Sequence, residues 1–372
     1  MVRPFSRRRS IGCLLTLVLA WPLPVSAQGP ELTYISNVTG TEAGGVTLTT
    51  VEEQTSAALD RLGEALRARG LGYSDVVVSN VFLRDTRHFQ AMNGVYRTYF
   101  QTNPPTRATV QADLLDPEAL IQISVVATGG PKEVVSPAGL RSPALPYSWG
   151  MKVGSTLFVS GATSRSPETY EPVAGDVPTQ TRRVFGNIGL VLDEAGMSFA
   201  DLVSCKVFLD DARSFGDMNG AYADFVPELD PPARATVRAP LMNVLFSTEI
   251  QCVAVSSPDR SVVRPEARGR SPYSPAIDTG DRVYLAGVTG RGDDAAEEAR
   301  AALGSIRSTL EAASLDFGDV EDVWVYLADV RDWDAVRVVL DETLGPEAPE
   351  ATVVGSRLMG RSVVEIQVVA KR

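Results

Sequence analysis

Histidine is nearly absent from this chain of 372 residues, because His88 is the only one. Metal sites built on imidazole need two or three such ligands, so the sequence predicts no bound metal. The same scarcity leaves one weak candidate, in a polar loop, for the base of a Ser-His triad. Any chemistry is therefore expected to come from other side chains, without a cofactor.

Cysteine is scarce as well, with three residues in the chain. Cys205 and Cys252 each lie in an apolar, strand-like run. Buried free thiols are the expected state there, because no dense cysteine framework is present. An oxidising compartment would also permit a disulfide between them, and the sequence leaves that pairing open.

Long apolar runs are missing too, since no segment reaches the ~20 residues that a membrane-spanning helix needs. Four arginines precede the apolar stretch 11–23, and Val25-Ser26-Ala27 follows it as an A-x-A-like cleavage site. This pattern predicts a signal peptide over residues 1–27, cleaved after Ala27, and a periplasmic or secreted product without a membrane anchor. Cys13 lies at the start of this stretch, before most of its apolar residues rather than after them, which argues against lipidation. The arginine run leaves Sec and twin-arginine export both open.

The mature chain also lacks a basic excess. Removal of residues 1–27 takes away four arginines and no acidic residue, which changes the formal charge from −11 to −15. Such a chain repels polyphosphates and has no basic-aromatic interleaving, so nucleic acid is not an expected partner.

An internal repeat is the strongest feature that is present. The run 89–96, FQAMNGVY, returns as FGDMNGAY at 215–222, and PPTRATV at 104–110 returns as PPARATV at 231–237. A more divergent copy, APEATV, stands at 348–353. The sequence therefore predicts three tandem units.

Each unit has the same α/β pattern: a strand, a helix with an apolar stripe, a valine-rich strand, a short helix and two alternating strands. The stripe of the second unit is Phe185, Ile188 and Leu192, and these positions are expected to be core. Linkers rich in Pro, Gly and Ser separate the units. The expected domains are 31–128, which lacks an opening strand, 140–256 and 268–372.

The repeated run and the strand that closes each unit resemble the RidA (YjgF-like) family. In that family an arginine in an x-Arg-[Ser/Ala]-x-Val strand is followed by a glutamate fifteen residues later, as Arg234 is by Glu249. The resemblance implies three chorismate-mutase-like domains, each a mixed sheet with two helices on one face. It also implies ligand clefts at the domain interfaces of an intramolecular pseudo-trimer, so the mature chain is expected to be a monomer.

The resemblance assigns roles to particular residues. It implies that Arg234 binds a substrate carboxylate and that Glu249 positions water to hydrolyse an enamine or imine to a 2-keto acid and ammonia. It also places further residues in substrate-binding positions, and neighbouring copies are expected to share a cleft. These are Arg107, Tyr147, Ser160, Gly161, Asn219 and Thr236.

The copies differ at the two main positions. Copy one keeps Arg107 but has Gln122 where the glutamate is expected, whereas copy three has Glu350 in place of the arginine and keeps Glu365. From this pattern we expect one complete cleft at most, with Arg234 depressing the pKa of Glu249 in the empty site.

Other readings of the same residues stay open. Arg234 and Glu249 also fit a structural ion pair, and Tyr147 also fits an ordinary packing role. The chain is equally compatible with a non-catalytic carboxylate-binding or scaffold protein, or with another hydrolase of this fold. The natural substrate is not readable from the sequence.

Overall fold

The computed structural model describes residue 1, residues 29–264 and residues 272–372. The predicted signal peptide, apart from its first residue, lies outside the described residues. Among the helices that are described, none has the length and apolar character required to cross a membrane.

The first repeat is a four-stranded sheet in the order β1-β6-β4-β5, with two helices packed on one face. Thr50 and Glu53 form a capping box at the start of α1, which fixes where that helix begins. Leu59, Leu62 and Leu66 are fully buried on its inner side, as the apolar stripe predicts. The elements are β1 (Thr33–Thr39), β2 (Glu42–Ala43), β3 (Val46–Thr47), α1 (Val51–Arg67), β4 (Val76–Leu83), α2 (Phe89–Tyr99), β5 (Thr106–Gln111) and β6 (Ile121–Ala127).

The second repeat has a larger sheet, because an added hairpin extends its edge beyond β9. The stripe of Phe185, Ile188 and Leu192 on α3 packs into the core of this repeat. Its elements are β7 (Glu133–Val135), β8 (Gly150–Val153), β9 (Thr156–Val159), β10 (Ala162–Thr163), α3 (Val177–Glu194), β11 (Leu202–Leu209), α4 (Phe215–Tyr222), β12 (Ala233–Arg238) and β13 (Thr248–Val255).

The third repeat follows the plan of the second, and its strand β20 pairs with β12 of the second repeat. The edge hairpins of these two repeats have no counterpart among the described residues of the first. The elements of the third repeat are β14 (Ser261–Val263), β15 (Ala276–Asp278), β16 (Arg282–Leu285), β17 (Val288–Thr289), α5 (Ala295–Ala312), β18 (Val320–Leu327), α6 (Trp333–Leu344), β19 (Thr352–Gly355), β20 (Arg357–Leu358) and β21 (Val364–Lys371).

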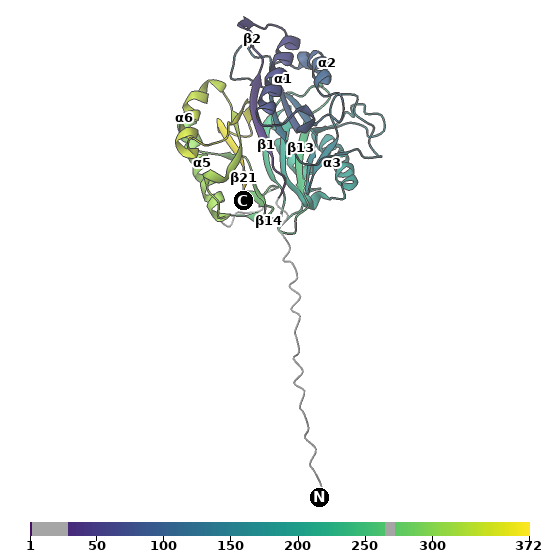
Figure 1. Cartoon of the computed structure of the whole chain (residues 1–372), viewed down its shortest axis with the longest axis vertical. Helices are drawn as coiled ribbons and strands as arrows, with labels where there is room; N and C mark the ends of the chain where they lie inside the picture. Colours follow the sequence, from purple (N-terminus) through teal and green to yellow (C-terminus); the bar gives the residue numbers. More distant parts are fainter. Residues whose placement is uncertain (2–28, 265–271) are drawn as a thin grey trace.

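The three sheets face one another around a common centre, which makes the chain an intramolecular pseudo-trimer. In Figure 1 the helices of the three repeats lie on the outside of the body, while β1, β13 and β21 lie toward its middle. One apolar cluster is built from all three repeats and includes the equivalent side chains Phe82, Phe208 and Tyr326. One face of each sheet is therefore buried against the other two sheets, and the opposite face is buried by the helices of its own repeat.

Strand register defines which positions of the repeats are equivalent. Leu83, Leu209 and Leu327 pair with Gln111, Arg238 and Gly355 in the neighbouring parallel strand. Four residues earlier in that strand stand Arg107, Arg234 and Ala351. The expectation that Glu350 replaces the arginine is therefore wrong: an alanine occupies that position, and the exposed Glu350 lies one residue before it.

Cys205 and Cys252 form a disulfide across the paired strands β11 and β13. Their Cα atoms lie 4.1 Å apart, because the two residues are directly opposite in the antiparallel register. The expectation of free thiols is therefore wrong. The sequence showed both cysteines in apolar strands but could not show that these strands are neighbours in register.

Candidate functional site

The same backbone contact between neighbouring repeats occurs twice, and it places each site at the interface between one repeat and the next. The backbone N–H of Gly161 donates to the carbonyl of Arg107 at 3.0 Å, and the N–H of Gly287 donates to that of Arg234 at 3.1 Å. These bonds fasten the start of a short strand of one repeat against the arginine strand of the preceding repeat. Side chains from two repeats consequently meet at each junction.

The first cleft joins repeats one and two. Arg107 comes from β5 of the first repeat, whereas Tyr147, Gly161 and Glu249 come from the second. About 270 Å³ is open to the centres of water-sized molecules between them. The remaining lining includes aromatic, polar and charged side chains: Phe89, Thr109, Thr163, Arg165, Tyr170 and Phe246.

The guanidinium of Arg107 is held in place from several sides. Nη2 donates to Oδ1 of Asn93 at 2.8 Å, and the rings of Tyr96 and Tyr147 lie 4.9 and 5.9 Å from its central carbon. The residue is 4 % exposed, and its Nη1 has no hydrogen-bond partner among the described residues. A buried cationic N–H group without a hydrogen-bond partner carries a cost in free energy. An anionic ligand that accepts a hydrogen bond from Nη1 would remove this cost.

Glu249 is the only carboxyl group that lines the first cleft in the described part of the chain. Burial raises its pKa to about 7, although a hydrogen bond from the Thr109 backbone and the charges of Arg107 and Arg165 act in the opposite direction. No ion pair joins Arg107 and Glu249 in the described structure. The two groups face one cleft without neutralising each other.

The junction of repeats two and three has the same arrangement of side chains, and we call it the second cleft because its positions are equivalent to those of the first. Nη2 of Arg234 donates to Oδ1 of Asn219 at 2.7 Å, and Nη1 again has no partner among the described residues. The rings of Tyr222 and Tyr273 lie 4.6 and 5.1 Å from the guanidinium carbon. Burial raises the pKa of Glu365 to about 8, against the charge of Arg234 and a hydrogen bond from the Thr236 backbone.

The structure does not bring Arg234 and Glu249 into one cleft. They lie on β12 and β13, with β11 between them, and Arg234 faces Glu365 while Glu249 faces Arg107. Two clefts therefore hold both an arginine and a glutamate, and the expectation of one complete cleft at most is wrong. The expected depression of the pKa of Glu249 is also wrong, because burial outweighs the neighbouring cations.

The third junction, between repeats three and one, lacks both the arginine and the glutamate. Ala351 stands at the arginine position and Gln122 at the glutamate position, where its Nε2 donates to the carbonyl of Val353 at 3.0 Å. Asn37 occupies the position of Gly161 and Gly287, and its side chain donates to the Ala351 carbonyl and accepts from the N–H of Val353. Asn37 thus takes the backbone donor that corresponds to the one used by Glu249 and Glu365.

The substrate-binding positions named from the sequence divide between the two clefts. Arg107, Tyr147 and Gly161 belong to the first, while Asn219 and Thr236 lie with Arg234 in the second. Ser160 faces neither, because its buried hydroxyl donates to the Ser148 carbonyl at 2.6 Å and accepts from the N–H of Arg107 at 2.8 Å. Its role is to position the arginine strand.

Sequence reasoning missed several residues of the sites. The sequence pattern places Glu365 in a copy without an arginine, and it does not indicate Arg165 or Thr109 as site residues. The repeat alignment alone could have paired each arginine with the glutamate of the following repeat, had the sharing of clefts between neighbours been carried through. Arg165 recurs in the third repeat as Arg291, but Arg291 is exposed, so the repetition alone does not mark Arg165 as a site residue.

A family model described as Endoribonuclease L-PSP matches the chain three times, over residues 28–129, 140–256 and 263–372. The chain belongs to the endoribonuclease L-PSP family, which includes the RidA proteins. Three matches in one chain agree with the three structural repeats.

Single-domain relatives of the family align with about one third of the chain. A RutC family protein of Pyrococcus abyssi is 38 % identical over 123 residues, which are 33 % of this chain and 96 % of the relative. The chloroplastic Reactive Intermediate Deaminase A of Arabidopsis thaliana is 33 % identical over 132 residues, covering 36 % of this chain and 70 % of the relative. These relatives match single repeats of the chain.

A solved chorismatase structure matches nearly the whole chain. It covers 92 % of this chain and 98 % of its own, with a TM-score of 0.54 and 13 % sequence identity. This likeness concerns the fold alone. It shows that a fold similar to that of nearly the whole chain occurs in another protein of known structure.

Proposed function

We propose that this RidA-family chain hydrolyses small 2-imino or 2-enamino acids to 2-keto acids and ammonia in its first and second clefts. One observation carries the proposal. In each cleft a buried arginine with an unpartnered Nη1 faces a buried glutamate whose pKa lies near neutrality. The first group fits a carboxylate, and the second fits an acid–base catalyst at neutral pH.

The chemistry follows from these two groups. The arginine holds the substrate carboxylate so that the imine carbon lies toward the glutamate. The carboxylate of Glu249 takes a proton from water as the water oxygen bonds to the carbon of the protonated imine, whose nitrogen becomes a neutral amine. The carboxyl group then protonates that amine. As the C–N bond breaks and ammonia leaves, the hydroxyl group gives its proton to the carboxylate and the 2-keto acid remains; loss of that proton to solvent restores the ionised glutamate.

Arg165 gives the first cleft a second guanidinium. It lies between the rings of Tyr170 and Phe246, 4.3 and 4.8 Å from its central carbon, and Nη1 donates to the Tyr170 carbonyl at 2.9 Å. Two cations and one glutamate favour a substrate that carries a second acidic group. In a Glu365→Gln background, Arg165→Gln should reduce kcat/KM for dicarboxylic imino acids more than for monocarboxylic ones. Arg291→Gln, at the equivalent exposed position, should change neither.

Release of keto acid and ammonia tests the proposal directly. An amino-acid oxidase would generate imino acids in the presence of the purified mature protein and, in parallel, of the Glu249→Gln/Glu365→Gln double variant. The wild type should accelerate keto-acid formation, and the double variant should not. Binding of a keto acid by both proteins without acceleration by either would instead support the non-catalytic carboxylate-binding alternative.

We also propose that the protein is exported and cleaved after Ala27. The leader pattern of residues 1–27 supports it, and the Cys205–Cys252 disulfide suits an oxidising compartment. Mass spectrometry of the mature N-terminus should find a chain that begins at Gln28. A chain that retains Met1, or a lipid-modified Cys13, would contradict this location.

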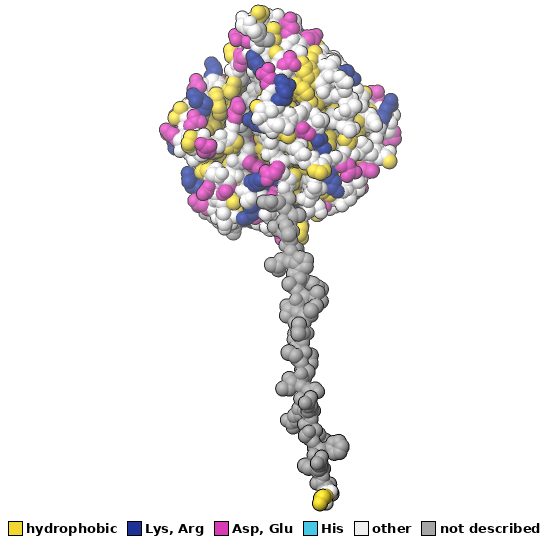
Figure 2. Space-filling view, in the orientation of Figure 1, with side chains coloured by type: hydrophobic (Ala, Val, Ile, Leu, Met, Phe, Trp, Pro, Cys, Tyr) yellow, Lys and Arg dark blue, Asp and Glu magenta, His cyan; other side chains and the backbone are white. Residues whose placement is uncertain are grey.

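One face of the molecule carries charges of both signs. On the face shown in Figure 2, cations and acidic side chains are interspersed, with no continuous basic area. This agrees with a small carboxylate as the expected partner.

A further inference from the structure

A cavity on the pseudo-threefold axis lies apart from both clefts and is lined by all three repeats. At its inner end the apolar cluster that contains Phe82, Phe208 and Tyr326 closes the axis. Toward the other end the equivalent residues Val126, Val253 and Val369 are half-buried. The cavity leaves about 70 Å³ for the centres of water-sized molecules, which is room for a ligand of a few heavy atoms.

One ring of equivalent positions makes this cavity asymmetric. Asn80, Lys206 and Trp324 occupy the same place in β4, β11 and β18, as their pairing with Ser124, Gln251 and Gln367 shows. A symmetric trimer would present three identical side chains here. This chain presents one amide, one amine and one indole, so it holds a single amine on its axis.

Lys206 differs from the other lysines of the chain. Of the four lysines in the sequence, Lys132 and Lys371 form ion pairs and Lys152 donates to a backbone carbonyl. In the described structure Lys206 has no hydrogen bond or ion pair, and its Nζ lies 3.7 Å from the centre of the Trp324 ring. Burial lowers its pKa to about 8, partly opposed by the charge of Asp322.

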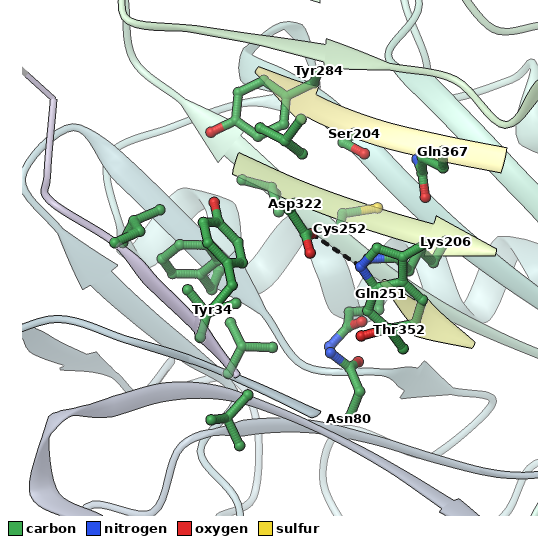
Figure 3. Close-up of a pocket in the computed structure, with 18 of the residues that line it drawn as sticks. Tyr34, Asn80, Ser204, Lys206, Gln251, Cys252, Tyr284, Asp322, Thr352 and Gln367 are labelled. Atoms are coloured by element: carbon green, nitrogen blue, oxygen red, sulfur yellow. Dashed lines mark hydrogen bonds between the residues drawn. The ribbon is translucent and has the colours of Figure 1, made fainter. Parts of the chain in front are cut away.

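Polar groups without partners line the same cavity as this amine. Oδ1 of Asn80, Nε2 of Gln251 and Oε1 of Gln367 are buried and have no hydrogen-bond partner among the described residues. Asp322 accepts from the Trp324 indole at 3.0 Å, and burial raises the pKa of its carboxyl. Figure 3 shows Lys206, Gln251, Asn80 and Thr352 along one side of the cavity, with Tyr34 and Tyr284 on the other.

We propose that the central cavity is a second ligand site, in which the Lys206 amine condenses with the carbonyl group of a small aliphatic aldehyde or ketone. The lone pair of Nζ attacks the carbonyl carbon, and proton transfer gives a carbinolamine. The Asp322 carboxyl donates a proton to its hydroxyl group, which leaves as water, and an imine to Lys206 remains after the nitrogen returns a proton to Asp322. The aliphatic part packs against the valines of the outer end.

The proposal does not depend on turnover in the clefts. The first cleft contains no lysine among its described lining residues, so a carbonyl compound bound there forms no such adduct. The product class of the proposed reaction, a 2-keto acid, nevertheless has the functional group that this cavity would take.

Reductive trapping tests the site. The mature protein would be incubated with butanal or 2-oxobutanoate and sodium cyanoborohydride at pH 7.5, digested, and mapped by mass spectrometry. At that pH the neutral fraction of an amine with a pKa near 8 exceeds that of an ordinary lysine on the order of a hundredfold. Among the four lysines we expect one main adduct, at Lys206, with a yield well above that at Lys152 in the same sample.

Variants distinguish the role of the Lys206 amine as a nucleophile from the role of its positive charge. Lys206→Arg keeps the cation over Trp324 but removes the nucleophile, so it should fold and lose the adduct. Asp322→Asn should slow adduct formation, and Glu249→Gln/Glu365→Gln should leave it unchanged. Labelling of Lys206 no stronger than that of Lys152 in the wild-type protein would overturn the proposal without relying on the folding of any variant.

Discussion

Gly161 leaves open the space that the Glu249 carboxyl group occupies. A β-carbon at position 161 would overlap Oε1 of Glu249 and approach the β-carbon of Ala108 to 3.0 Å. Gly287 has the same relationship to Glu365 in the second cleft. The glycine therefore allows a glutamate from one strand to reach the arginine strand of the preceding repeat.

Gly161→Ala should displace the Glu249 carboxyl group and reduce turnover in the first cleft. The fold should survive, because the atom in conflict is the end of a flexible side chain. In a Glu365→Gln background, which silences the second cleft, we expect a loss in kcat of roughly 10²-fold or more, as when a positioned acid–base group is removed. Gly186→Ala, in α3 with open space around it, is the matched control and should retain activity.

The first cleft and the second should differ in their dependence on pH. A glutamate must be ionised to accept a proton from water, so kcat/KM should rise with pH through the pKa of the free enzyme. The Glu365→Gln variant should show this rise near pH 7, and the Glu249→Gln variant should show it near pH 8. Profiles that are flat between pH 6 and 9 in both variants would remove the two glutamates from the proton transfer.

The raised pKa of Glu249 makes the folded protein less stable as pH rises. The pKa of Glu249 is higher in the folded state than the ordinary value of 4.5, so the folded chain binds more protons between that value and about 7. Its ionisation therefore lowers the free energy of unfolding as pH rises. Glu249→Gln should stabilise the protein by roughly 3 kcal/mol at pH 9 and by less than about 1 kcal/mol at pH 5. Chemical denaturation at the two values measures the difference.

Much of the fold was accessible from the sequence, because it depends on repeated local patterns. The duplicated motifs, the apolar stripe around Phe185 and the alternation of the final strands predicted three α/β units with helices on one face. The site was less accessible. Arg234 and Glu249 are fifteen residues apart in one unit, but strand β11 separates their strands in the sheet. Arg234 therefore faces the third repeat and Glu249 faces the first, and only the packing of the repeats shows this.

Single-residue differences in register were also beyond the sequence. Glu350 aligns with the arginines by motif, whereas the parallel pairing of β18 and β19 places Ala351 there. The disulfide depends in the same way on β11 and β13 being opposite each other at Cys205 and Cys252.

The disulfide should contribute measurably to stability. It closes a chain segment with a sequence separation of 47 residues, so replacement of both cysteines by alanine should lower the free energy of unfolding by roughly 2 to 4 kcal/mol. Denaturant titration of the wild type with and without a reducing agent measures the same effect. The double variant is the control, because a reducing agent should not change its midpoint; equal midpoints for all samples would show that the bond does not form in solution.

The mature chain should be a monomer. Its three repeats bury one another's sheet faces, as a closed trimer of single domains would, and no further copy is needed to complete either cleft. Multi-angle light scattering should give the mass of one chain at micromolar concentration. A stable trimer of full chains would contradict this expectation.

Asn37 should matter for stability and not for turnover. Its side chain bridges the Ala351 carbonyl and the Val353 N–H at the junction that lacks an arginine. Asn37→Ala leaves both backbone groups without that partner, so we expect a loss of about 1 to 3 kcal/mol in the free energy of unfolding. The keto-acid release assay should give an unchanged kcat/KM, because both complete clefts are formed by other repeat junctions. A large loss of activity in a folded Asn37→Ala protein would mean that the third junction takes part in the reaction.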